Sequence, residues 1–163
     1  MSAKAETGMT REDFQDLIAT VTSAIAGRPL DDDLMTILND RFPAGGDTFR
    51  AIADACHAAV ADGWMCKHEG GGIRFGRVLK PAPEIAGFSV DVVHMADLAG
   101  PHHRHPNGEI DMIMPIDDSA QFDGHGVGWF VYGPDSAHSP TVTGGAALVL
   151  YLLPGGAIEF TSG

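Results

Sequence analysis

The first third of the chain carries apolar side chains at the three- and four-residue spacing of amphipathic helices. Thr10 is a suitable N-cap for the first of these helices, because acidic residues follow it in the expected first turn. Each apolar stripe is too short to be stable alone, so it has to pack against the rest of the chain or a second subunit. Residues 1–9 lack the pattern and are expected to form a tail. We expect three helices, between Thr10 and Gly27, between Asp31 and Pro43, and between Asp47 and Gly63.

From residue 63 onward the pattern changes to short apolar or alternating runs, and glycine or proline separates nearly all of them. Short runs separated by glycine and proline are typical of an antiparallel sandwich or barrel. Glycines 70–72 indicate a hairpin between the first two runs. We therefore predict a mainly β fold, with a helical N-terminal segment at residues 1–62 and a β-body at residues 63–163. This boundary marks a change of structural class and need not separate independently folding units. The expected strands are 64–68, 73–79, 88–95, 109–116, 128–132, 146–153 and 157–161.

Length and charge narrow the classes of function. The chain has 163 residues, enough for one domain of ordinary size, and its formal net charge of −12 argues against nucleic acid or an anionic membrane as a partner. No run approaches about 18 consecutive apolar residues, and the N-terminus lacks the apolar run of a signal peptide. We therefore expect a cytoplasmic protein with no membrane segment. Cys56 and Cys66 form no CxxC pair, and in a reduced cytosol both are expected to be free thiols.

Three of the eight histidines lie in one short stretch that also contains a carboxylate, and within it His103-x-His105-x-x-x-Glu109 has the spacing of metal ligands. On a strand, His103 and His105 would point to the same face. The turn residues at positions 106–108, Pro-Asn-Gly, can bring Glu109 back beside them. Neutral imidazoles and a carboxylate are suitable ligands for Zn, Fe, Mn, Co or Ni. The stretch therefore predicts a divalent metal site.

A further ligand is expected from a later turn. His138 follows Gly133-Pro134 and would lie on the strand that leaves this turn. Together with His103, His105 and Glu109 it forms a set that leaves one or two positions open on a five- or six-coordinate metal, where substrate or water could bind. The alternative is a solvated loop whose histidines have only chance affinity for nickel.

These two segments resemble the motifs of the cupin superfamily. His103-x-His105-x-x-x-Glu109 resembles the first cupin motif, and Gly133-Pro134-x-x-x-His138 resembles the second. In the second motif the spacing is one residue shorter than in the commoner Pro-x-Gly-x-x-His pattern, and Ser136 stands where a glycine is usual. The resemblance implies that residues 73–163, roughly, form a jelly-roll barrel with the metal inside its mouth. Together with the apolar helices, it also favours a homodimer.

A narrower resemblance, to the 4-hydroxylaminobenzoate lyase family, covers most of the chain. It rests on the runs 71–77, 102–109 and 132–142 behind the helical segment. It implies an enzyme of bacterial nitroaromatic degradation that converts a small aromatic acid, 4-hydroxylaminobenzoate, to protocatechuate and ammonia. The same ligands would serve a cupin dioxygenase acting on a small aromatic acid. A non-catalytic cupin would use them only to report a bound ligand.

For a lyase, the carboxylates near the histidines would have distinct roles. Glu109 would be a fourth metal ligand or a general base, and the sequence leaves both open. The departing hydroxyl needs a proton donor, for which Asp111 and Tyr132 are candidates. Asp111 shares a face of the expected strand with Glu109. The alternatives are a hydrogen-bonded carboxylate at the barrel mouth for Asp111 and a packing role for Tyr132.

The substrate carboxylate would need a cationic partner, and arginine is preferred because its planar fork binds both oxygens. Arg74 and Arg77 are three residues apart on an expected strand, so only one of them would point inward unless Gly76 marks a bulge. Arg104 should face away from the two neighbouring histidines by the same alternation. We prefer Arg74, with a surface ion pair as the alternative for each arginine.

Overall fold

The computed structural model describes residues 10–161, and the expected tail at residues 1–9 lies outside that range. The helices confirm the expected boundaries: Thr10 and Asp13 form a reciprocal capping box at the start of the first helix, and Gly63 ends the last helix in the left-handed conformation (φ 86°). Within the described residues, no helix has the length and apolar character needed to cross a membrane. The helices are α2 (Arg11–Ile25), α3 (Asp32–Arg41) and α4 (Asp47–Asp62).

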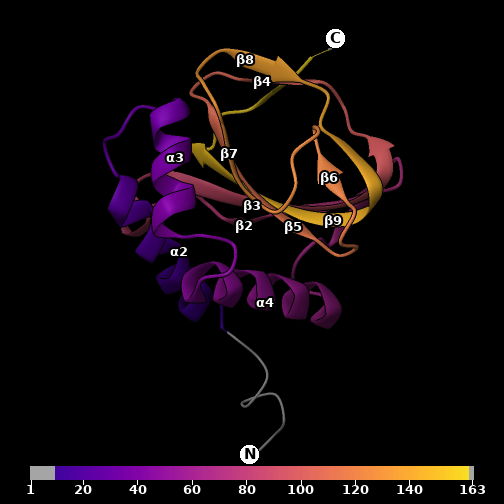
Figure 1. Cartoon of the computed structure of the whole chain (residues 1–163), viewed down its shortest axis with the longest axis horizontal. Helices are drawn as coiled ribbons and strands as arrows, with labels where there is room; N and C mark the ends of the chain where they lie inside the picture. Colours follow the sequence, from indigo (N-terminus) through magenta and orange to yellow (C-terminus); the bar gives the residue numbers. More distant parts are fainter. Residues whose placement is uncertain (1–9, 162–163) are drawn as a thin grey trace, which may run out of the picture.

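The remainder of the described chain forms two antiparallel sheets. The seven-stranded sheet has the order β1-β2-β3-β9-β5-β7, with β6 paired to β9, and the small sheet has the order β10-β4-β8. Figure 1 shows β4 and β8 on the side of the molecule opposite α4. The mainly β prediction is confirmed, and the two sheets fit a jelly roll. A short 3-10 helix (Pro83–Ile85) precedes β3, and the strands are β1 (His68–Gly70), β2 (Ile73–Leu79), β3 (Phe88–Ala99), β4 (His103–His105), β5 (Glu109–Pro115), β6 (Gln121–Phe122), β7 (Gly128–Tyr132), β8 (Ser136–His138), β9 (Thr141–Pro154) and β10 (Glu159–Phe160).

The large sheet buries both of its faces, which explains why its central strand β9 is apolar over most of its length. One face packs on the three helices, and the other lines the space between the sheets. The apolar stripes of the helices therefore pack on this chain's own sheet and no longer require a second subunit, and the homodimer stays a prediction. Alternate residues of β9 serve the two cores: Leu148, Leu150 and Leu152 face the helices, and Val149, Tyr151 and Leu153 face the space between the sheets.

Helix α3 also closes an edge of the large sheet. The Asn39 side chain accepts a hydrogen bond from Trp129 N and donates one to Trp129 O, both at 3.0 Å. The Trp129 indole donates to Phe42 O at 2.9 Å. Since β7 is the last strand of this sheet, the two bonds with Asn39 occupy backbone groups of Trp129 that an edge strand would otherwise leave unpaired.

The expected strand at residues 64–68 is wrong. Trp64 N and Met65 N both donate to Ala59 O, at 3.1 and 3.3 Å, so the chain stays folded against the end of α4. The Trp64 ring meets Phe14 edge-on, with the ring centres 6.2 Å apart, and Met65 is fully buried. This apolar run serves the packing of the helices on the sheet, and β1 begins only at His68.

Candidate metal centre

The pairing of β4 with β8 brings three histidines together. His103 and His105 are two apart on β4 and share a face, and the register places His138 directly opposite His103. Residues that are paired across antiparallel strands lie on the same face, so all three rings point to the same side. Arg104 lies between the two β4 histidines and faces away from them, where it forms ion pairs with two acidic residues, as the alternation predicted.

Glu109 reaches the histidines from the other sheet, because it begins β5 directly after the turn that leaves β4. Gly108 donates to His105 O at 3.2 Å and has a φ of +88°. A Cβ at Gly108 would lie 2.7 Å from the Leu30 side chain and 2.8 Å from Tyr132 O, so only glycine fits this turn. The turn thus returns the chain with the Glu109 carboxylate facing the three rings.

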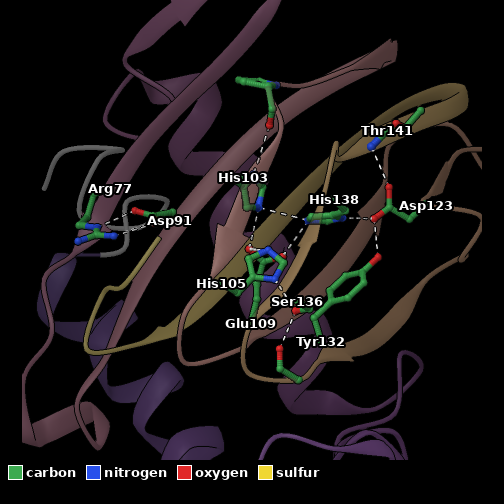
Figure 2. A network of polar contacts seen from close by, with 12 residues as sticks. Arg77, Asp91, His103, His105, Glu109, Asp123, Tyr132, Ser136, His138 and Thr141 are labelled. Carbon is green, nitrogen blue, oxygen red and sulfur yellow. Dashed lines mark hydrogen bonds and ion pairs between the residues drawn. The ribbon is translucent and has the colours of Figure 1, made fainter. Parts of the chain in front are cut away.

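The four side chains converge on one point between the sheets, as Figure 2 shows. Glu109 Oε1 lies 3.1 Å from His105 Nε2 and 3.4 Å from His103 Nε2, and Glu109 Oε2 lies 3.6 Å from His138 Nε2. The Nε2 atoms of His103 and His138 are 3.2 Å apart. One ligand atom from each residue lies within 4.8 Å of all the others, and His103, His105 and Glu109 are almost completely buried.

The outer nitrogen of each ring, Nδ1, has a hydrogen-bond acceptor, and this determines where the ring protons lie. Ser136 Oγ donates its own proton to Gly133 O at 2.6 Å, so it can only accept from His105. In their neutral form, all three rings therefore carry the proton on Nδ1 and present an Nε2 lone pair to the centre. The Nδ1 acceptors are Pro101 O for His103 at 3.4 Å, Ser136 Oγ for His105 at 2.9 Å and Asp123 Oδ2 for His138 at 2.5 Å.

This centre has the donor set of a cation site. Within residues 10–161, His105 Nε2 and both oxygens of Glu109 are buried without a hydrogen-bond partner. Burial alone would raise the pKa of Glu109, but hydrogen bonds from the three imidazoles, when their Nε2 atoms carry protons, hold it well below its ordinary value. Burial lowers the pKa of His138, whereas Asp123 and Glu109 raise it to about 9. Three imidazole nitrogens and a carboxylate fit a first-row divalent metal, which would compete with protons for these atoms.

Asp123, in the turn after β6, lies behind His138, and sequence reasoning missed it. Asp-Gly pairs such as Asp123-Gly124 are common in turns, so the local sequence gave no functional signal. Its Oδ2 atom contacts His138 Nδ1 and accepts from the Tyr132 hydroxyl, both at 2.5 Å. Only the fold brings the turn after β6 beside β8.

Asp111 and Tyr132 occupy different positions around the centre. Asp111 lies on the inner face of β5, two residues beyond Glu109, and is fully buried. Neither of its carboxyl oxygens has a hydrogen-bond partner among the described residues, and burial and the charge of Glu109 raise its pKa. Tyr132 lies opposite Glu109 on β7, and its hydroxyl is engaged by Asp123. Burial and the hydrogen bond to Asp123 raise the pKa of Tyr132.

A cavity of about 310 Å³ adjoins the metal centre, and His103 belongs to both. Its walls are mainly apolar and include the side chain of Tyr151. Cavities with mainly apolar walls and a few polar groups are typical of binding sites for small organic molecules. The other apolar side chains of the wall include Phe75, Val93, Met95, Ile158 and Phe160.

Residues 16–160 match the family described as PnbB, 4-hydroxylaminobenzoate lyase. The chain belongs to this family. The 4-hydroxylaminobenzoate lyase of Nocardioides sp. (strain LMS-CY) is 32% identical over 160 residues, which cover 93% of this chain and 95% of that one. The 4-hydroxylaminobenzoate lyase of Pseudomonas putida is 31% identical over 140 residues, or 76% of this chain and 80% of its own. This membership identifies the protein as an enzyme of the lyase class.

Solved structures with a partial likeness to this lyase include cupin proteins. An oxalate oxidase in complex with the substrate analogue glycolate has 19% identity, a TM-score of 0.38 and a match over 57% of each chain. An RmlC-like cupin protein from Ralstonia eutropha has 12% identity, a TM-score of 0.38 and a match over 52% of this chain and 58% of its own. These likenesses carry no information about activity.

In this lyase it is Arg77, and not the preferred Arg74, that lines the cavity. Ile73, Phe75 and Arg77 alternate along β2 toward the cavity, so Arg74 lies on the other face of the strand. Arg77 Nε and Nη2 bond the two oxygens of Asp91 at 2.9 and 3.2 Å, as seen in Figure 2. The Nη1 group of Arg77 makes no hydrogen bond within the part of the chain that the structure describes.

Proposed function

We propose that this enzyme converts 4-hydroxylaminobenzoate to protocatechuate and ammonia, with a divalent metal held by His103, His105, Glu109 and His138. The observation that carries the proposal is the double position of His103, which belongs both to the cluster of Nε2 atoms and to the wall of the apolar cavity. An aromatic ring in that cavity would therefore lie beside the metal centre. The names of the curated relatives support the substrate.

The proposed conversion is redox-neutral overall and needs no external oxidant. The N–O bond of the hydroxylamino group breaks with electrons supplied by the ring, and the oxygen leaves as water after it gains a proton. A water then adds to the ring carbon next to the nitrogen-bearing carbon. This addition leaves the nitrogen as an imine, and a second water hydrolyses the imine and releases ammonia. The attacked ring carbon then loses its hydrogen as a proton, and the carbonyl oxygen gains one, so the ring becomes aromatic again. Two waters are consumed and one is released, so the balance is one water added for one ammonia lost.

The chain's own residues have distinct proposed roles in this conversion. A bound divalent ion, which could be Fe, Mn, Zn, Co or Ni, would supply Lewis acidity toward an oxygen ligand. Glu109 is proposed as the fourth ligand, because both of its oxygens face imidazole Nε2 atoms. Asp111 is proposed to protonate the departing hydroxyl from its position beside Glu109. Tyr132 would have a structural role, because its hydroxyl donates a hydrogen bond to Asp123, the residue that contacts His138.

Turnover under nitrogen tests this function. The purified protein should release ammonia and protocatechuate in equal amounts from 4-hydroxylaminobenzoate, at the same rate with and without oxygen. Removal of divalent metal with a chelator should abolish the activity, and re-addition of one of the candidate metals should restore it. An absolute need for oxygen would instead identify a dioxygenase. Tight binding of the substrate with no ammonia released over hours would identify a non-catalytic binding protein.

Arg77 is proposed to bind the substrate carboxylate through its Nη1 group. Arg77→Gln should raise the KM for 4-hydroxylaminobenzoate by about 10- to 100-fold, the equivalent of one charge-assisted hydrogen bond, while kcat changes little. The matched variant Arg74→Gln loses the same charge from the same strand but from its other face, so its KM should remain near that of the wild type.

Phenylhydroxylamine, which lacks the carboxylate, separates a binding role of Arg77 from a structural one. The wild-type enzyme should discriminate strongly between the two substrates, and Arg77→Gln should lose most of that discrimination. If the variant slows turnover of both substrates equally, Arg77 only supports the cavity wall through Asp91.

A further inference from the structure

The carboxylate of Asp123 divides its two oxygens between backbone and side-chain partners. Oδ1 accepts from Thr141 N at 2.9 Å, and Asp123 N in turn donates to Thr141 O at 2.8 Å. Asp123 itself has a left-handed backbone (φ 51°), which aspartate tolerates better than most residues. This two-way bond to Thr141 fixes the carboxylate in place and leaves Oδ2 for the His138 ring and the Tyr132 hydroxyl.

His138 depends on this carboxylate more than the other ligands depend on their partners. It lies on β8, a strand of only three residues at the edge of the small sheet, and its side chain is the most exposed of the four, at 11%. His103 and His105 are buried and face neutral acceptors, a backbone carbonyl and a hydroxyl. Among the described residues, His138 is thus the ligand whose outer nitrogen faces a charged acceptor.

We propose that Asp123 is the positioning residue of the metal centre. It holds His138 in the tautomer with the proton on Nδ1 and directs the Nε2 lone pair toward Glu109 and His103. This inference rests on the proposed metal binding and assigns Asp123 no contact with metal or substrate. A carboxylate behind a ligating imidazole both orients the ring and increases its basicity as a ligand.

The variant Asp123→Asn is a sharp test because all three partners of the carboxylate are donors in this arrangement. An amide has only one oxygen, so its NH₂ group must face either the Thr141 N–H or the two donors that share Oδ2, the His138 ring and the Tyr132 hydroxyl. The Thr141 backbone N–H cannot change its role, whereas the imidazole can move its proton to the other nitrogen. The amide oxygen should therefore stay with Thr141, and the NH₂ group should face His138 and force its proton onto Nε2, where it blocks the metal.

The measurement is the dissociation constant of Zn²⁺, obtained by competition with a chromophoric chelator. Asp123→Asn should weaken Zn²⁺ binding by about 10- to 100-fold. Tyr132→Phe leaves the contact of Asp123 with His138 intact and should weaken binding much less. Asp118→Asn removes the same charge from an exposed position and should leave it unchanged.

Nitrogen NMR of histidine-labelled, Zn²⁺-loaded protein gives a second readout that a merely structural role would not move. The wild type should show His138 bound through Nε2 with a proton on Nδ1, and Asp123→Asn should lose that signature while the signatures of His103 and His105 persist. Equal Zn²⁺ affinity of Asp123→Asn and the wild type, with His138 still bound through Nε2, would overturn the inference. A wild-type protein that binds no divalent metal would instead refute the proposed function on which the inference rests.

Discussion

Replacement of His103 by alanine is expected to lower both divalent-metal affinity and turnover by at least about 100-fold. His103 supplies one of the four converging ligand atoms, and its ring contacts those of His105 and His138, with centres 4.7 Å apart in each case. It also forms part of the cavity wall, so its loss affects the site at which metal and substrate would meet. Metal retained after dialysis and the rate of ammonia release measure the two effects.

His102→Ala is the matched control for this prediction. His102 directly precedes His103, and a shift of register by one could put it in the place of His103. In the structure its ring contacts the Thr161 hydroxyl, away from the centre. The control should keep its metal and its activity. A His103→Ala protein that holds no metal yet turns over at the wild-type rate would refute the metal-dependent mechanism.

Phe14→Ala is expected to lower the free energy of unfolding by about 3–5 kcal/mol. Phe14 is fully buried on α2 and meets Trp64 edge-on in the core that joins the helices to the large sheet. Deletion of the ring would leave a cavity in this shared core. Urea unfolding followed by tryptophan fluorescence measures the change, and the transition should remain single because helices and sheet share one core.

Val127→Ala provides the control for stability, since Val127 is 56% exposed and should change the free energy of unfolding by no more than about 0.5 kcal/mol. The same experiment tests the predicted boundary near residue 63. It shows whether the helical segment and the β-body unfold separately or together. If Phe14→Ala produces a separate early transition and leaves the unfolding of the β-body unchanged, the helical segment folds as a unit of its own.

The helices were predictable in detail because their signals are local. Thr10 with Asp13, Asp31 with Leu34 N, and Gly63 each satisfy backbone groups within a few residues of themselves. The strand predicted at residues 64–68 was wrong for the same reason, because that prediction also used only local signals. The apolar residues of this run fit a strand equally well, and only the position of Phe14, some fifty residues earlier in the chain, makes Trp64 part of the helix–sheet core.

The grouping of His103, His105 and Glu109 was also predictable, because it depends on one short motif, whereas the approach of His138 depends on the pairing of β4 with β8. Alternation along β4 places His103 and His105 on one face, and the turn that requires Gly108 returns Glu109 to them. The choice between Arg74 and Arg77 was not predictable. Both fit the pattern of β2, and the outcome depends on which face of that strand the second sheet covers.

The sequence by itself determined the helix ends, the mainly β body and the types and spacing of the candidate ligands, since each depends on residues close together in the chain. Only the tertiary structure decided that Asp123 lies behind His138, that Arg77 lines the cavity and that Tyr151 is the tyrosine in its wall. These outcomes depend on the register of strands far apart in sequence, and a shift of one residue would turn each side chain to the opposite face.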